Sequence, residues 1–206
     1  MNNYILDTNI FFNMEAGLGL GNNTKEIAMN LNKIKNLNNS LTIEFFTTPS
    51  VVTEIESFFD SKEDPVLEVL INLLTVKSPS TSDMNLSCAI FESLITDYRE
   101  RSYRGMKVAE EEIAETGKLF MGKEVLPHKE FQMAIGKKIA TLRDRFRNAT
   151  RTGTIDSQAD LEVVLLSKEL RAPLISTDEG VLKWGRKIGI LEMSPSVFGK
   201  KMQDFL

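Results

Sequence analysis

The sequence of 206 residues contains a single cysteine, Cys88, and a single histidine, His128. One cysteine excludes an internal disulfide, which suits a reducing cytoplasm. One histidine leaves little material for an imidazole-rich metal site or for Ser-His-Asp catalysis. No apolar run is long enough to span a bilayer. We therefore expect a cytoplasmic protein without membrane contact, in which Cys88 is a small core residue and His128 a solvated residue at a helix start.

Positive charge is scarcer than negative charge, with 25 Lys and Arg against 29 Asp and Glu and a formal net charge of -4. The whole chain is thus not an obvious nucleic-acid binder, and any affinity for RNA must come from local basic faces. The N-terminus lacks the basic segment of a signal peptide, and Asp7 interrupts its first apolar stretch. With 42% hydrophobic residues, the chain can bury a sizeable core, and we expect one domain with an inserted segment.

Alternating strand and helix patterns in the first part of the chain predict a parallel sheet. Continuous apolar stretches predict strands over residues 3–7 and 41–47. The glycine-rich residues 16–23 lack the spacing of a phosphate-binding loop, so we interpret them as a flexible connector. Thr48 and Pro49 predict a helix start. The apolar residues expected to point inward are Ile27, Leu31, Ile34 and Leu37 on one helix, and Val51, Val52, Ile55 and Phe58 on the next.

The middle of the chain breaks this alternation. Two long helical stripes, joined around residues 117–127, predict a helical hairpin over 85–150. This hairpin would be inserted into an α/β domain formed by residues 1–84 and 151–206. The stripes consist of Leu86, Ile90, Leu94 and Tyr98 in the first helix, and Phe131, Ile135, Ile139, Leu142 and Phe146 in the second.

After the hairpin, the alternation of helix and strand resumes. Gly153 is placed to end the second hairpin helix. We then expect a helix over 157–170, a strand over 173–177, a helix over 179–187 and a short strand near 190–192.

Four aspartates stand where strands end or where a helix begins. Asp7 follows the first strand, Asp178 follows a late strand, and Asp156 and Asp160 lie one turn apart at a helix start. Ligands of open α/β sheets bind beyond the carboxyl ends of the strands. Acids gathered there repel one another unless a hard cation such as Mg²⁺ joins them. The four aspartates therefore predict a metal-dependent enzyme that acts on phosphates.

Each acid also has a structural explanation. Asp156 can cap a helix and complement its dipole, Asp178 precedes Glu179-Gly180 as a helix cap does, and Asp7 can start a turn. Asp160 resists such an explanation, because its helix is apolar nearly all round and we expect its carboxylate to be buried. Glu54 can either reach the same crevice or be an exposed helix residue, and both interpretations stay open.

The same residues resemble a known family. A strand ending in Asp7-Thr8-Asn9, acids after the second strand and in a later helix, and a strand ending in Ser-Thr-Asp resemble the PIN domain of metal-dependent ribonucleases. Three stretches, TTPSVVTEIESF, YRERSYRGMKVAEEEI and IDSQADLEVVLLSKELRAPLISTDEGVLKWGRKIGI, are similar to the HARP family of minimal single-protein RNase P enzymes. That family includes archaeal relatives once labelled RNA-ligase partner proteins. The resemblance covers nearly the whole chain and is poor in residues 16–23 and in the asparagine-rich helix that follows them.

The resemblance implies a PIN-like α/β fold that removes the 5′ leader of precursor tRNA without an RNA subunit. The family's catalytic and metal-binding aspartates fall on Asp7, Asp156, Asp160 and Asp178. These would hold one or two Mg²⁺ ions, with Mn²⁺ as an alternative. The products would be a 5′-phosphate on the tRNA and a 3′-hydroxyl on the leader. The resemblance also implies dimers that join through the hairpins into larger homo-oligomers.

A basic stripe and an apolar tip give the hairpin two expected roles. Arg143, Arg147 and Arg151 recur every fourth residue and predict contacts with RNA phosphates, with pairing to the acids at 110–115 as the alternative. The apolar tip predicts an assembly surface, with a tip folded back on its own domain as the alternative. The tip residues are Leu119, Phe120, Met121, Val125 and Leu126.

Two other functions stay open. A general PIN endoribonuclease of the toxin type is disfavoured by the long hairpin, because toxins of that type are compact. A non-catalytic RNA-binding or RNA-ligase partner is the second alternative. Cleavage of precursor tRNA in Mg²⁺ without added RNA separates all three.

Overall fold

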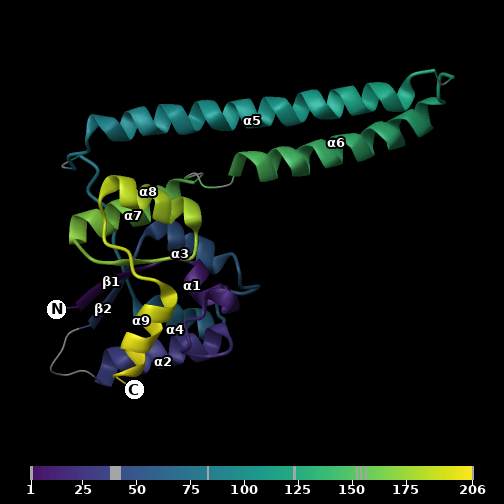
Figure 1. The fold of residues 1–206 in the computed structure, drawn as a ribbon. Helices are drawn as coiled ribbons and strands as arrows, with labels where there is room; N and C mark the ends of the chain where they lie inside the picture. The colour runs from purple at the N-terminus through teal and green to yellow at the C-terminus, as the bar shows by residue number, and fades with distance from the viewer. Residues whose placement is uncertain are drawn as a thin grey trace. The chain divides into compact units, whose positions relative to one another are not determined.

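The computed structural model describes residues 2–37, 43–82, 84–122, 124–151, 153, 155 and 157–205. The chain divides into two compact units, Met1–Leu86 with Gly153–Leu206, and Ser87–Thr152. The second unit is thus an insertion in the sequence of the first (Figure 1).

A parallel sheet forms the centre of the first unit, as the sequence predicts. The order is β3-β2-β1-β4, and the isolated parallel bridge of Glu192 with Leu174 accounts for the expected strand near 190–192. Because all four strands are parallel, their carboxyl ends meet at one edge of the sheet. The interior position of β1 therefore places Asp7 in the middle of that edge. The strands are β1 (Asn2–Leu6), β2 (Ile43–Thr47), β3 (Leu74–Val76) and β4 (Leu174–Ile175).

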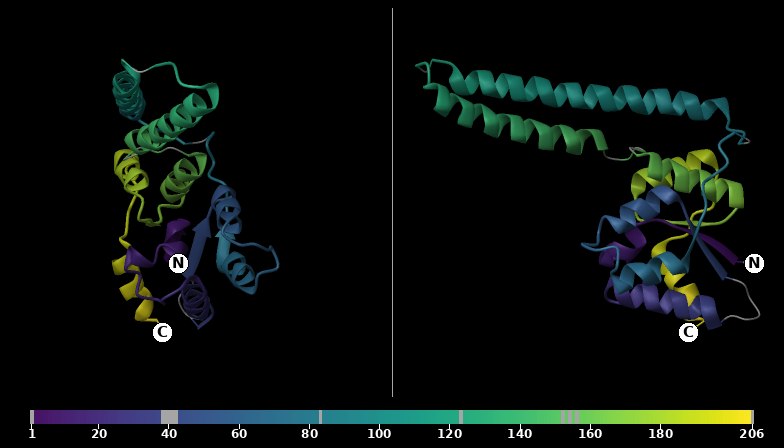
Figure 2. Two further views of the ribbon diagram at one scale, coloured as in Figure 1. Left: turned by 90° about the vertical axis from the view of Figure 1, so that its right-hand side faces the viewer. Right: turned by 180° about the vertical axis from the view of Figure 1, so that it is seen from behind.

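Helices cover both faces of this sheet (Figures 1 and 2). Both faces of β1 are consequently apolar, and the consecutive residues Tyr4, Ile5 and Leu6 are all buried. One layer contains α3 (Pro49–Glu56), α7 (Gln158–Leu170) and α8 (Glu179–Ile188), and the other contains α2 (Thr24–Leu37), α4 (Pro65–Leu73) and α9 (Pro195–Gln203). The short α1 (Asn9–Phe12) and a 3₁₀ turn, η1 (Met14–Ala16), follow β1.

The ends of these helices follow the capping residues in the sequence. The Thr48 side chain accepts a hydrogen bond from the Val51 N–H at 3.4 Å, and Pro49 occupies the first turn, as predicted. Ser157 caps α7 in the same way. Gly189, with φ of 78°, ends α8 in the left-handed conformation that favours glycine.

Three predictions about side chains of the apolar stripes and loops need correction. Residues 16–23 are a connector, but a packed one, because Leu18 and Leu20 are buried. Phe58 does not point inward: α3 ends at Glu56, and Phe58 is 55% exposed. Cys88 is exposed at the first position of its helix rather than packed in a core.

The second unit is the predicted helical hairpin, formed by α5 (Cys88–Phe120) and α6 (His128–Arg151) packed side by side (Figure 1). Gly105 permits the close approach, because a Cβ there would lie 2.5 Å from the Phe146 ring. His128 is exposed at the start of α6, as expected.

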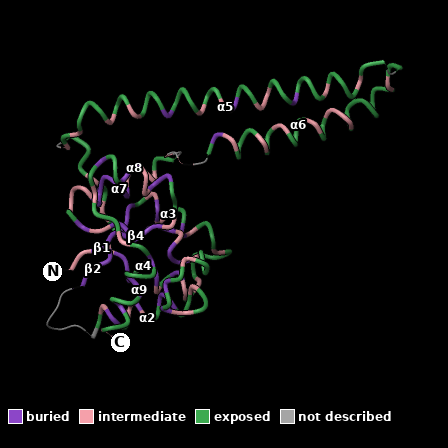
Figure 3. Tube along the Cα trace, in the orientation of Figure 1, coloured by how far each residue is buried: buried purple, intermediate pink, exposed green. Residues whose placement is uncertain are grey.

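The hairpin buries little apolar surface of its own. Its buried residues are Asp97, Gly105, Glu112 and Thr150, and none of its large hydrophobic side chains is buried among the residues described. Exposed and half-exposed positions run along both helices (Figure 3). Among the described helices of the whole chain, none has the length and apolar character required to cross a membrane.

Candidate active site

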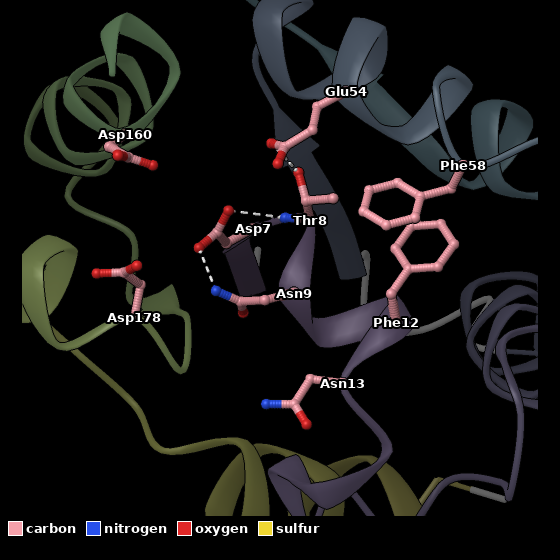
Figure 4. Close-up of a pocket in the computed structure, with 9 residues that line it drawn as sticks. All are labelled: Asp7, Thr8, Asn9, Phe12, Asn13, Glu54, Phe58, Asp160 and Asp178. Atoms are coloured by element: carbon pink, nitrogen blue, oxygen red, sulfur yellow. Dashed lines mark hydrogen bonds between the residues drawn. The ribbon is translucent and has the colours of Figure 1, made fainter. Parts of the chain in front are cut away.

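A pocket of about 350 Å³ opens at the carboxyl edge of the sheet. It is entirely within the first unit and brings together Asp7, Asp160 and Asp178, three of the four aspartates singled out from the sequence (Figure 4). The fourth, Asp156, lies outside the described residues. The remaining lining residues are Thr8, Asn9, Phe12, Asn13, Glu54 and Phe58.

Asp7 is the buried acid of the pocket, with only 6% of its surface exposed. The Thr8 N–H donates to Oδ1 at 2.7 Å. Two neutral side chains donate to Oδ2, the Asn9 amide at 2.8 Å and the Ser176 hydroxyl at 2.6 Å. These three hydrogen bonds fix the carboxylate and offset part of the cost of its burial.

Burial also governs the charge of Asp7. Desolvation is the largest influence and raises the pKa from 3.8 to about 6. The hydrogen bonds from Ser176 and Thr8 oppose this rise in pKa because they favour the charged form. The negative charges of Asp160 and Glu54 add to it. Among the described residues that line the pocket, the charged ones are all acidic.

Asp178 both caps a helix and lines the pocket. Its Oδ1 accepts hydrogen bonds from the N–H groups of Gly180 at 2.7 Å and Val181 at 3.0 Å, so it is the helix cap that its sequence context indicates. The same carboxylate lines the pocket (Figure 4). The two roles are compatible, because the hydrogen bonds of the cap use only Oδ1 of the Asp178 carboxylate.

Asp160 lies in the first turn of α7, where Ser157 accepts a hydrogen bond from its N–H at 3.0 Å. The expectation of a buried carboxylate is wrong, since Asp160 is only half-buried. Its apolar neighbours Val163 and Val164 pack into the core, whereas the first turn projects past it into the pocket.

Glu54 reaches the pocket from α3 and is also exposed, so both interpretations left open by the sequence hold for it. Although it is exposed to solvent, its Oε2 accepts a hydrogen bond from the Thr8 hydroxyl at 2.7 Å. The residue that follows Asp7 therefore orients a second carboxylate at the same edge.

Asn9 was noticed in the sequence only as a neighbour of Asp7, yet it joins two strand ends. Its amide nitrogen donates to Asp7 and, at 3.1 Å, to the Ser176 hydroxyl. Its Oδ1 accepts the Thr177 N–H at 3.1 Å. The sequence does contain a hint of these two roles. Asn9 and Ser176 stand beside the acids in Asp7-Thr8-Asn9 and Ser176-Thr177-Asp178, two segments that the sequence analysis interpreted only as strand ends.

The predicted basic stripe lies on the hairpin, the other compact unit. Arg143, Arg147 and Arg151 are exposed on α6. Two other cations of α6 pair with acids of α5: Arg145 contacts Glu111 and Glu112, and Lys138 lies 3.6 Å from Glu115. Arg147 lies 3.9 Å from Asp144 of its own helix.

The donor chemistry of the pocket fits a hard divalent cation. Its charged groups are carboxylates, and such oxygens suit Mg²⁺ and Mn²⁺. In the part of the chain that the structure describes, Asp7, Glu54 and Asp178 form no ion pair with Lys or Arg, so their charge is not already neutralised. The described acids do not by themselves form a cluster of three tight enough to count as a metal site.

Comparisons with known proteins agree with this geometry. A family model described as a PINc domain ribonuclease matches residues 3–206. The chain belongs to the PINc domain ribonuclease family. It is 32% identical to a protein named RNA-free ribonuclease P from Thermococcus kodakarensis, over 98% of this chain and 95% of the relative. A protein of the same name from Thermodesulfovibrio yellowstonii is 30% identical, over 98% of this chain and 92% of the relative.

The PINc domain assignment confirms the predicted family and the α/β fold. The roles of the individual aspartates stay predictions.

The raised pKa of Asp7 predicts an unusual pH dependence of stability without metal. The native state binds the Asp7 proton more tightly than the unfolded chain, so this group costs stability as pH rises from about 4 to about 7. A shift from 3.8 to about 6 corresponds to about 3 kcal/mol. Asp7→Asn removes the charge, so its free energy of unfolding relative to that of the wild type should increase as pH rises from about 4 to about 7. Urea unfolding in EDTA at several pH values measures the difference.

Asp204→Asn is the matched control, because Asp204 is exposed and away from the pocket. Its stability relative to the wild type should change little with pH over the same range. A difference between Asp7→Asn and wild type that stays constant from about pH 4 to about pH 7 would contradict the electrostatic account of Asp7.

Proposed function

We propose that this protein is an RNA-free ribonuclease P, an endoribonuclease that removes the 5′ leader from precursor tRNA with the help of Mg²⁺ or a similar divalent ion. The observation that carries this proposal is full-length similarity to relatives of that name, together with the acid pocket at the sheet edge. A compact toxin-type nuclease is not favoured, because the similarity extends through the hairpin. A non-catalytic RNA partner leaves the acid pocket unexplained.

Asp7, Asp160 and Asp178, with Asp156, are the residues proposed to hold the metal. When bound, the ion supplies positive charge at the scissile phosphate and makes water a better nucleophile. The chain's own residues prepare the site. Asn9 and Ser176 hold the Asp7 carboxylate in place, and Thr8 holds Glu54 toward the pocket. Displacement at phosphorus would leave a 5′-phosphate on the tRNA and a 3′-hydroxyl on the leader.

The exposed arginines of α6 are the proposed contacts to the tRNA body, and the hairpin is the proposed assembly surface. The hairpin has no large buried hydrophobic side chain among its described residues, so the apolar side chains along it are only partly covered within their own unit. Association of copies through the hairpins, first as dimers and then as larger homo-oligomers, would cover them. We place this activity in the cytoplasm, where precursor tRNA is the substrate.

Asp160→Asn tests the assignment of the acids. The substitution keeps the shape of the side chain and removes one metal-binding charge, so we expect cleavage of precursor tRNA to be abolished. It should also reduce the gain in melting temperature that Mg²⁺ gives the wild type, because that gain measures metal binding to the native state. Melting in EDTA should be unchanged or slightly higher. Asp204→Asn is again the control. Cleavage by Asp160→Asn at the wild-type rate would exclude a catalytic role.

Replacement of Arg143, Arg147 and Arg151 by alanine tests the RNA contacts. If each arginine contacts a phosphate, the variant should bind precursor tRNA more weakly, and the slope of log affinity against log salt should flatten by about 0.7 to 0.9 per lost contact. Arg145→Ala is the matched control, since Arg145 pairs with Glu111 and Glu112. It should destabilise the hairpin and leave the salt slope near that of the wild type. Equal slopes for the triple variant and the wild type would contradict the RNA contact.

Met121→Ser with Val125→Ser tests assembly through the tip. Both side chains are largely exposed, 78% and 99%, whereas Phe120 already contacts Phe131 with ring centroids 5.8 Å apart. We expect smaller particles by light scattering, unchanged helix content by circular dichroism, and cleavage of precursor tRNA impaired more than cleavage of a short unstructured RNA. Wild-type protein that is monomeric at micromolar concentration would refute the assembly.

A further inference from the structure

Two aromatic rings share the pocket with the acids. Phe12 comes from α1, five residues after Asp7, and Phe58 comes from the turn that ends α3 (Figure 4). Neither ring has a function in holding a metal or moving a proton. Their presence in a pocket of carboxylates therefore needs another explanation.

The two rings form a stack. Their centroids are 4.1 Å apart and their planes differ by 14°, while Phe59 meets Phe12 edge-on at 6.0 Å. The Phe58 N–H donates to the Ile55 carbonyl at 3.1 Å, which ties the turn to α3. Phe12 covers one face of Phe58, and the Phe58 side chain remains 55% exposed. The uncovered part of the Phe58 ring is thus an aromatic surface at the pocket.

Core packing does not account for the exposure of Phe58. The unit has other aromatic side chains that pack fully, and Tyr4, Phe11, Phe45 and Phe198 are buried. An exposed phenylalanine leaves apolar surface in water, which costs free energy in proportion to its area. Such an aromatic face, next to groups that act on a phosphodiester, suits a flat apolar ligand, and every nucleobase offers a π-face.

We propose that Phe58, backed by Phe12, stacks on the base of the last leader nucleotide and so positions the scissile phosphate against the acids. This inference rests on the proposed function. The leader side is favoured because the first nucleotide of the mature tRNA is paired in the acceptor stem and stacked in its helix. The last leader nucleotide is single-stranded, and unpaired bases are the ones that stack on aromatic side chains in RNA recognition.

The test is a double-mutant cycle between protein and RNA. Precursor tRNA with a normal or an abasic last leader nucleotide is cleaved under single-turnover conditions in Mg²⁺ by the wild type and by Phe58→Leu, which keeps apolar volume but loses the ring. On the normal substrate we expect Phe58→Leu to be slower by roughly 5- to 100-fold, the range of base–aromatic stacking. The abasic substrate should slow the wild type by a similar factor and Phe58→Leu by little more.

Two further variants separate stacking from structure. Phe58→Tyr keeps the ring and should retain the preference for the normal substrate. Phe59→Leu alters the same aromatic cluster, but Phe59 does not line the pocket, so this variant should discriminate between the substrates as the wild type does. Melting temperatures show whether each variant is folded.

Equal wild-type rates on the two substrates would overturn the inference, as would a Phe58→Leu defect of the same size on both. Neither result would contradict the proposed ribonuclease P activity. Failure of the wild type to cleave any precursor tRNA would instead overturn the proposed function, and the inference with it.

Discussion

The buried carboxylate of Asp7 is the constraint on which the first unit depends. It lies at the end of the interior strand β1, and the parallel order β3-β2-β1-β4 brings the ends of the neighbouring strands beside it. Asn9, which follows β1, and Ser176, which follows β4, both donate hydrogen bonds to its Oδ2. A slip in the register of β1 against β4 would separate these partners and leave a buried charge without hydrogen bonds, which is costly.

The hairpin is held together by a different kind of interaction. Its buried acid, Glu112, accepts a hydrogen bond from Arg145 at 2.6 Å and lies 3.8 Å from Lys138. The two cations of α6 thereby fix the register of the helices, while the large apolar side chains stay at least partly exposed in the described residues. Polar pairing can specify which faces of two helices meet, but it contributes less to stability than apolar burial. The hairpin is therefore suited to gain stability from a partner.

The sequence was most informative where backbone periodicity decides the outcome. Parallel strands must present their last residues at one edge, so Asp7 and Asp178 could be placed together without coordinates. Prediction from the sequence was wrong where the outcome depends on the residue at which a helix begins or ends. Asp160 was expected to be buried because its neighbours are apolar, but the first turn of α7 lies beyond the core. Phe58 continues the apolar spacing of α3, yet the helix ends two residues earlier and the ring turns to the pocket.

Neutral donors around Asp7 have a consequence for chemistry. A lysine or arginine in the place of Asn9 would also satisfy the carboxylate, but it would lower the pKa of Asp7 and neutralise the charge that a cation needs. Asn9 and Ser176 instead orient the oxygens and leave the negative charge available. The desolvation that raises the pKa of Asp7 makes its charged form unfavourable without metal, and the proposed divalent ion would relieve the same cost. Burial, neutral hydrogen bonds and clustered acids are parts of one electrostatic arrangement.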